Sequence, residues 1–173
     1  MNDRAPAPGG LALVEALVNT LDIETGADSL DTTDGRAPFG LAERDVPAAR
    51  ELREALRAAC LAHAGHRAPG RSPAALDELL ARAPLHVTVA EDGSAALRPA
   101  DPGPLVSRIA HALAAAAADG TWARLKACEA EDCQWAYYDR SPAGRRRWCS
   151  MSVCGARAKM RTYRARRIST GTG

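Results

Sequence analysis

Apolar residues recur at helical spacing through most of the first 120 residues of the chain. Three leucines fall four residues apart within 11–22 and predict a buried helix there. A stretch rich in Gly, Asp, Thr and Pro at 23–40 predicts a loop. The strongest amphipathic pattern lies at 46–65, where Pro47 suits a first helical turn and Gly65 suits a C-terminal stop. We therefore expect two core helices joined by an irregular segment.

The pattern is more varied in the middle of the chain. Leucines at helical spacing predict a helix over 72–84, and an alanine-rich stretch predicts a longer helix over 104–128, broken near Gly120. Between these helices, alternating positions at 85–89 and 94–99 flank a turn and predict a β-hairpin.

After residue 122, aromatic and basic residues replace the alanines. Strand-forming residues, a turn and a basic return predict a second β-hairpin over 135–148. A helix is predicted over 151–167, and its apolar face would be formed by Val153, Ala156, Met160 and Tyr163. The predicted fold class is therefore α+β: a mainly helical N-terminal domain with a small β-hairpin at 1–122, and a separate module with a hairpin and a helix at 123–173.

Length and composition narrow the classes of protein. With 173 residues, 46% of them hydrophobic, the chain can form one modest domain plus a small module. Its polar, Pro/Gly-rich start is unlike a secretory signal, and no stretch reaches the roughly 18 apolar residues that a membrane span needs. We expect no membrane association and a cytoplasmic, reducing location, where five cysteines favour metal or redox chemistry over disulfides.

Charge is distributed unevenly along the chain. Residues 1–123 carry 11 Arg and 17 Asp or Glu, a balance of −6, whereas 124–173 carry 12 Lys or Arg and 4 Asp or Glu, a balance of +8. Basic segments of this kind usually meet phosphate groups. The sequence therefore predicts an acidic body with a basic appendage.

Four of the five cysteines form two closely spaced pairs. Four residues separate Cys128 from Cys133 and Cys149 from Cys154, and fifteen residues separate the pairs. This spacing is typical of a four-thiolate structural zinc site, because each pair can wrap one edge of a tetrahedron. The hairpin between the pairs and the helix bearing the last cysteine would form a treble-clef-like finger around one structural zinc. Disulfides, a redox switch and an iron–sulfur cluster remain alternatives.

No other motif indicates an active site. A zinc ion bound by four thiolates has no open position for water, and no catalytic motif occurs elsewhere, so we do not expect an enzyme. Cys60 lies on the inward face of its predicted helix and is expected in the core. His63 and His66 lie near one helix end without a neighbouring ligand in the sequence to complete a metal site.

Positive charge gathers around the second cysteine pair. The predicted nucleic-acid-binding residues are Arg145, Arg146, Arg147, Arg157, Lys159, Arg161, Arg164, Arg166 and Arg167. On a rigid helix, such residues would neutralise phosphates and present guanidinium groups to guanine edges of a duplex. DNA is the expected partner, and RNA or an acidic protein could use the same surface.

The residues around the cysteines resemble a known family. The stretch CEAEDCQWAYYDRSPAGRRRWCSMSVCGARAKMRTYRARR at 128–167 resembles the CGNR-type zinc fingers. Upstream, LALVEALVNTLD and ARELREALR resemble the ABATE domain, which accompanies such fingers in bacterial stress-induced transcription regulators. The resemblance implies zinc held by Cys128, Cys133, Cys149 and Cys154, and DNA binding by the C-terminal module. The tetrapeptide that names the family has Asn after Gly, whereas this chain has Ala156.

Together, these patterns predict a zinc-containing, DNA-binding transcription regulator that responds to stress or to a ligand. A small-molecule effector would bind the N-terminal domain, and a homodimer is compatible with the sequence. Two other functions remain open. One is a protein-interaction module whose basic finger docks an acidic partner, and the other is a redox sensor based on thiols or zinc.

Overall fold

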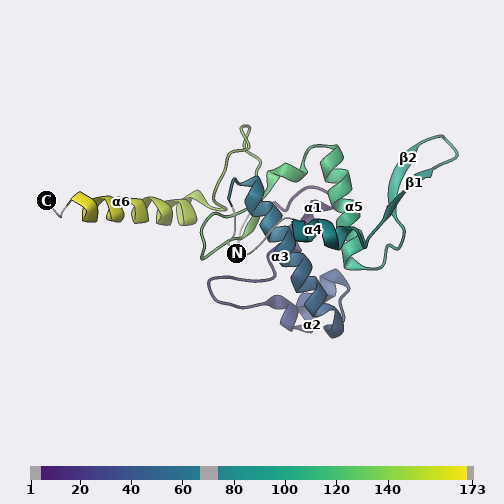
Figure 1. Ribbon diagram of the computed structural model, residues 1–173, viewed down its shortest axis with the longest axis horizontal. Helices are drawn as coiled ribbons and strands as arrows, with labels where there is room; N and C mark the ends of the chain where they lie inside the picture. The colour runs from purple at the N-terminus through teal and green to yellow at the C-terminus, as the bar shows by residue number, and fades with distance from the viewer. Residues whose placement is uncertain (1–4, 67–73, 171–173) are drawn as a thin grey trace.

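The body of the molecule is built around three helices. The computed structural model describes residues 5–66 and 74–170, with side chains described as far as Arg164. Helices α1 (Leu11–Val18) and α5 (Leu105–Ala118) pack together, and α1 also packs on the long helix α3 (Val46–His63). The short helix α4 (Ala74–Leu80) contacts both α3 and α5. Figure 1 shows a β-hairpin projecting from one side of this body and the C-terminal helix from the other.

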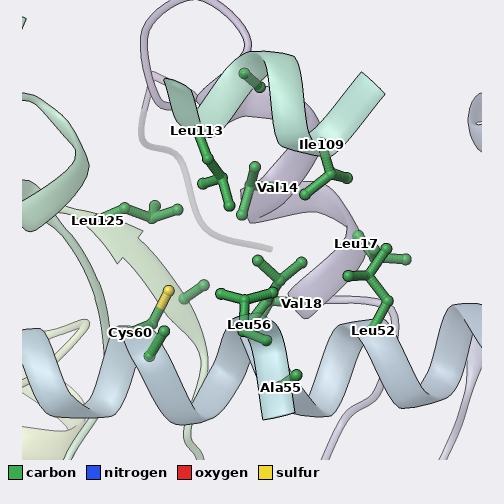
Figure 2. Packing of buried hydrophobic residues seen from close by; sticks show 14 of the residues in the cluster. Val14, Leu17, Val18, Leu52, Ala55, Leu56, Cys60, Ile109, Leu113 and Leu125 are labelled. Carbon is green, nitrogen blue, oxygen red and sulfur yellow. The ribbon is translucent and has the colours of Figure 1, made fainter. Parts of the chain in front are cut away.

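The main core lies where these helices meet a short strand. Val14, Leu17, Leu56 and Ile109 are fully buried there, and Leu125 reaches the same cluster from the strand that follows α5. Figure 2 shows these side chains converging from all four elements. Each fully buried Leu, Ile or Val side chain contributes roughly 1.5–3 kcal/mol to folding. The apolar periodicity of the first 120 residues is thus the pattern of this core.

Two antiparallel hairpins differ sharply in burial. In the first, β1 (Leu85–Val89) pairs with β2 (Ala95–Pro99) and leaves Val87 65% exposed. In the second, β3 (Leu125–Ala127) pairs with β4 (Ala136–Tyr138), and β3 is buried at all three positions. The second hairpin belongs to the core of the helical domain, since β3 lies against α3.

The N-terminal elements match the predicted order but not every predicted boundary. The helix predicted over 11–22 ends at Val18, because Asn19 caps it and Leu21 forms a β-bridge with Asp28. The loop predicted over 23–40 is confirmed at 23–28, whereas 29–39 form a series of short helical turns. They are the 3-10 turns Ser29–Asp31 and Ala37–Phe39 and the helix α2 (Thr33–Arg36).

Side-chain caps explain these turns. The side chain of Asp28 accepts a hydrogen bond from the backbone nitrogen of Leu30 at 3.1 Å, and that of Thr32 accepts one from Gly35 at 3.1 Å. Short polar residues commonly stabilise turns in this way. Another 3-10 turn, Glu43–Asp45, leads into α3, which matches the predicted 46–65 helix closely.

The later helices are shorter than predicted. Helix α4 covers only part of the predicted 72–84 helix, whose first two residues lie outside the described residues. The helix predicted over 104–128 ends at Ala118, and Gly120 then adopts a positive φ of 74°. Glycine favours this conformation because it has no Cβ. The 3-10 turn Trp122–Arg124 and strand β3 occupy the rest of the predicted helix.

The predicted α+β fold class is confirmed, but the second predicted hairpin has a different partner. Strand β4 pairs with β3 rather than with the basic return at 145–148, which forms no strand. Side-chain bonds hold that return instead, and one of them runs from the Tyr137 hydroxyl to the Arg146 carbonyl at 2.7 Å.

The C-terminal helix extends away from the body. A π-helical turn at Met151–Gly155 leads into α6 (Ala156–Thr170). Its predicted apolar face is not buried: Val153, Met160 and Tyr163 are 47%, 51% and 55% exposed. Helix α6 projects from the body (Figure 1), and its described side chains include both apolar and basic ones that are exposed to solvent.

Candidate metal centre and basic surface

The structure brings four cysteines from distant positions into one cluster. Cys128 follows β3, Cys133 lies in the turn before β4, Cys149 ends the basic return, and Cys154 lies in the π-helical turn before α6. Their four sulfur atoms all lie within 4.8 Å of one another. Three of these cysteines are buried, and Cys133 is partly buried.

The sulfur spacing fits a tetrahedral zinc ion. The Sγ atoms of Cys133 and Cys149 are 3.7 Å apart, and those of Cys149 and Cys154 are 3.8 Å apart. A regular tetrahedron with Zn–S bonds of about 2.3 Å has edges of about 3.8 Å. A disulfide would need about 2.05 Å between sulfurs, and all four cysteines are free thiols. The cluster is therefore consistent with one structural zinc ion.

The electrostatics of the cluster are consistent with a bound cation. Hydrogen bonds from Cys133 and Cys149 lower the pKa of Cys128, so one thiolate forms readily. Hydrogen bonding to Cys128 raises the pKa of Cys133 to about 12, and burial raises the pKa of Cys154. Thiols this close cannot all ionise unless a positive charge compensates them. A divalent ion that prefers thiolates supplies that charge.

Backbone hydrogen bonds shape the turn that carries the first cysteine pair. The backbone nitrogens of Cys133 and Gln134 both donate to the carbonyl of Ala130, at 2.9 and 3.0 Å. Gln134 has a φ of 47°, and it is the one non-glycine residue with positive φ among the described residues. A left-handed backbone at such a residue persists where surrounding contacts enforce it.

A buried carboxylate organises the loop between β4 and the second cysteine pair. Asp139 is fully buried and accepts hydrogen bonds from Ser141, from the backbone nitrogen of Arg146 at 2.9 Å and from the Lys126 Nζ at 3.1 Å. Burial opposes ionisation, but these bonds outweigh it and lower the pKa of Asp139 to about 2. The ionised Asp139 thus fixes both ends of the turn that leads to Cys149.

Three side chains of the helical domain hold the cysteine module in place. The Asn19 amide donates to the carbonyl of Ala136 at 3.0 Å and accepts from its nitrogen at 2.7 Å. The fully buried Arg57 donates to the carbonyl of Gln134 at 2.9 Å. His63 Nδ1 donates to the carbonyl of Leu125 at 2.7 Å, and its ring packs edge-on against Trp122.

These three contacts were not predicted from the sequence. The predicted 11–22 helix runs through Asn19 without indicating a distant partner for it, and an arginine on α3 resembles a surface residue. His63 and His66 form no metal site with the cysteines among the described residues. His63 binds Leu125, and His66 Nε2 lies 3.5 Å from Glu129 Oε2. Cys60 is buried in the core as predicted, and burial raises its pKa to about 12.

The predicted basic residues fall into two groups among the described side chains. Four of them contact the protein itself. Arg146 donates to the carbonyl of Cys149 at 3.1 Å, and Arg147 pairs with Glu129. Arg157 lies 3.4 Å from Glu24, and Arg161 lies 3.8 Å from Asp132.

The second group consists of Arg145, Lys159 and Arg164, which are exposed and form no ion pair with the described residues. Arg166 and Arg167 lie in α6, but their side chains are outside the described ones. Lys159 and Arg164 also lie in α6, and Arg145 lies on the return before Cys149. The structure thus places basic groups on both sides of the second cysteine pair.

Two family models match adjacent parts of the chain. The model described as "CGNR zinc finger" matches residues 124–167. The ABATE model, described as "Putative stress-induced transcription regulator", matches residues 11–120. No curated protein matches the chain. Among the described residues, no helix has the length and apolar composition needed to cross a membrane.

Proposed function

Because the chain belongs to the ABATE family and carries a CGNR zinc finger, we propose that it is a transcription regulator that binds duplex DNA. The observation that carries the proposal is helix α6, which starts beside the cysteine cluster and exposes basic residues over its described side chains, as far as Arg164. A helix of 15 residues is about 22 Å long and fits a major groove about 12 Å wide. No catalytic role is assigned, since four thiolates leave no open position on zinc.

We assign one structural zinc to Cys128, Cys133, Cys149 and Cys154. These four residues would hold the ion, and they would thereby tie the end of β3 and the turn before β4 to the basic return and the π-helical turn before α6. The residues at 123–173 would act as the DNA-binding unit and those at 1–122 as the regulatory unit, in the cytoplasm. The sulfur spacing of 3.7–3.8 Å supports this ligand set.

The nine predicted basic residues would contribute unequally to DNA binding. Arg145, Lys159 and Arg164 are available to phosphates without breaking an ion pair with a described residue. Arg157 and Arg161 must exchange their exposed acidic partners for phosphate, which costs little because exposed ion pairs are weak. Arg146 and Arg147 mainly hold the return, and Arg166 and Arg167 extend the basic series along α6.

The test is a fluorescence-anisotropy titration of the zinc-loaded protein with duplex DNA at several salt concentrations. If about half of the nine residues engage phosphates, log affinity falls against log salt with a slope of roughly −4 to −6. Lys159→Gln and Arg164→Gln should each reduce the slope by about 0.9. Arg98→Gln makes the same charge change on the exposed strand β2 and serves as the control. Absent or salt-insensitive binding would refute the proposal.

One observation favours a second candidate, a protein partner. Val153, Met160 and Tyr163 are about half exposed beside the basic residues, and a protein could bury them. Binding to such a partner should survive high salt and should weaken in Met160→Ser more than in Lys159→Gln. DNA binding should show the opposite order.

A further inference from the structure

A cavity lies at the contact between the helical domain and the zinc finger. Its volume is about 690 Å³, and no cysteine lines it, although Trp135 and Tyr137 of its wall also pack beside the four cysteines. Helix α1 forms one wall with Ala12, Glu15 and Ala16, and the opposite wall carries Trp135, Tyr137 and Tyr138. Ligand sites commonly occupy cavities of about 300–1,000 Å³ at such contacts between domains.

The sequence explains why space exists between these walls. Ala12 and Ala16 are four residues apart, so both small side chains lie on one face of α1. Trp135 directly precedes β4, and Tyr137 lies in that strand two residues further on. Trp135 is the partly exposed ring of the two, because Tyr137 is 1% exposed. Small alanine side chains and aromatic rings thus line the same cavity, and this composition suits a planar apolar group.

Two arginines add positive charge to the rim of this cavity. The guanidinium carbon of Arg140 lies 5.1 Å from the centre of the Tyr138 ring, and that of Arg146 lies 5.4 Å from the centre of the Tyr137 ring. Arg140 donates one hydrogen bond to the carbonyl of Pro6 at 2.8 Å, and Arg146 donates one to the carbonyl of Cys149. Neither forms an ion pair with a described carboxylate.

The one carboxylate in the cavity wall already accepts a hydrogen bond. Glu15 Oε2 accepts from the backbone nitrogen of Ala7 at 2.6 Å, so this acid holds the N-terminal segment against α1. The net charge of the lining is positive. An arginine side chain has five N–H donors and can bind a carboxylate while keeping another contact.

We propose that this cavity binds a small planar aromatic carboxylate. The ring would lie between Trp135 and the alanines of α1, and the carboxylate would face Arg140 and Arg146. Such a ligand would touch the helical domain and the finger at once and stabilise their contact. This inference goes beyond the proposed function and does not depend on DNA binding.

The experiment is calorimetric titration of the zinc-loaded full chain with benzoate, salicylate and indole-3-acetate. The uncharged alcohols of the same ring systems are the ligand controls. From the affinity that a ligand of this size commonly reaches, indole-3-acetate should bind with a dissociation constant of about 1 mM or better. The alcohols should bind at least about tenfold more weakly, because they cannot pair with the arginines.

Two variants test the location. Ala16→Leu fills part of the cavity, and Arg140→Gln removes one charge from an exposed position; each should weaken binding about tenfold or more. Ala115→Leu makes the same enlargement at an exposed position of α5 and should bind like the parent. If Ala16→Leu does not fold, Arg140→Gln decides the test. The proposal is wrong if no acid binds at concentrations about ten times the expected dissociation constant of about 1 mM. It is also wrong if the alcohols bind as tightly as the acids, or if Arg140→Gln binds the acids as tightly as the parent does.

Discussion

Arg57 offers the sharpest test of how the helical domain supports the finger. Its side chain is fully buried and donates to the carbonyl of Val18 at 2.8 Å and to that of Gln134 at 2.9 Å. It also lies 3.3 Å from Glu54. We consider the substitution Arg57→Met, which keeps the length of the side chain and removes the charge and the donors.

The expected cost follows from those contacts. A hydrogen bond from a charged group is worth about 1.5–3 kcal/mol, and two buried carbonyls would lose their donor. Glu54 keeps Arg53 as a partner at 3.0 Å, so it is not left without a positive neighbour. Arg57→Met should therefore lower the free energy of unfolding by about 3–5 kcal/mol. It should also weaken zinc binding, because Gln134 directly follows Cys133 and its left-handed backbone loses its support.

The assay has two parts and one control. Urea unfolding followed by circular dichroism gives the free energy, and competition with a chromophoric chelator gives the zinc affinity. The control is Arg53→Met, because Arg53 is also buried on α3 but bonds to Thr20 and Asp28 within the helical domain. The reasoning is refuted if both variants release zinc at the same chelator concentration, or if Arg57→Met costs less than about 1 kcal/mol.

Three further predictions test neighbouring parts of the structure. Asn19→Ala should cost about 2 kcal/mol in urea unfolding, since it removes both hydrogen bonds to Ala136, and an unchanged midpoint would contradict this. Burial lowers the pKa of His63 below its usual 6.5, so the neutral ring favours the fold. The unfolded chain therefore takes up a proton on this ring more readily than the folded chain. Lowering the pH from 8 to 6 should reduce the free energy of unfolding of the parent by at most about 0.8 kcal/mol more than that of His63→Gln, and urea unfolding at both pH values would show this. Cys149→Ser should abolish stoichiometric zinc in elemental analysis, whereas Cys60→Ser should keep it, and a full zinc content in Cys149→Ser would exclude the four-cysteine site.

The sequence predicts local and periodic features well. Helix α3 follows from apolar spacing, because it buries residues at the helical period, and the first hairpin follows from two strand-forming stretches on either side of a turn. The cysteine cluster follows from spacing along the chain, because a tetrahedral ion restricts where two pairs can lie. These features depend on residues that lie within about 26 positions of one another along the chain.

Contacts between distant segments could not be predicted in the same way. Nothing around Asn19 in the chain indicates that it binds Ala136, because the two residues meet only when α1 and β4 pack together. Arg57 has the charge of a surface residue, and only the folded chain shows its buried partners. The hairpin partner of β4 was predicted wrongly for a related reason. The residues at 145–148 follow strand-forming residues and a turn, but β4 pairs with β3 because that pairing places β4 against the apolar core.

Strand β3 limits how this chain can be divided or recombined with other proteins. It ends one residue before the first cysteine, and yet Leu125 and Ala127 fill space among the helices. A cut between the helices and β3 would expose apolar surface on both fragments. The helical fragment would lack the side chains that fill its core, and the finger fragment would expose Leu125 and Ala127 to solvent. The finger is therefore not an independent module. Transferring it to another protein would require transferring the surface of the helical domain on which β3 packs.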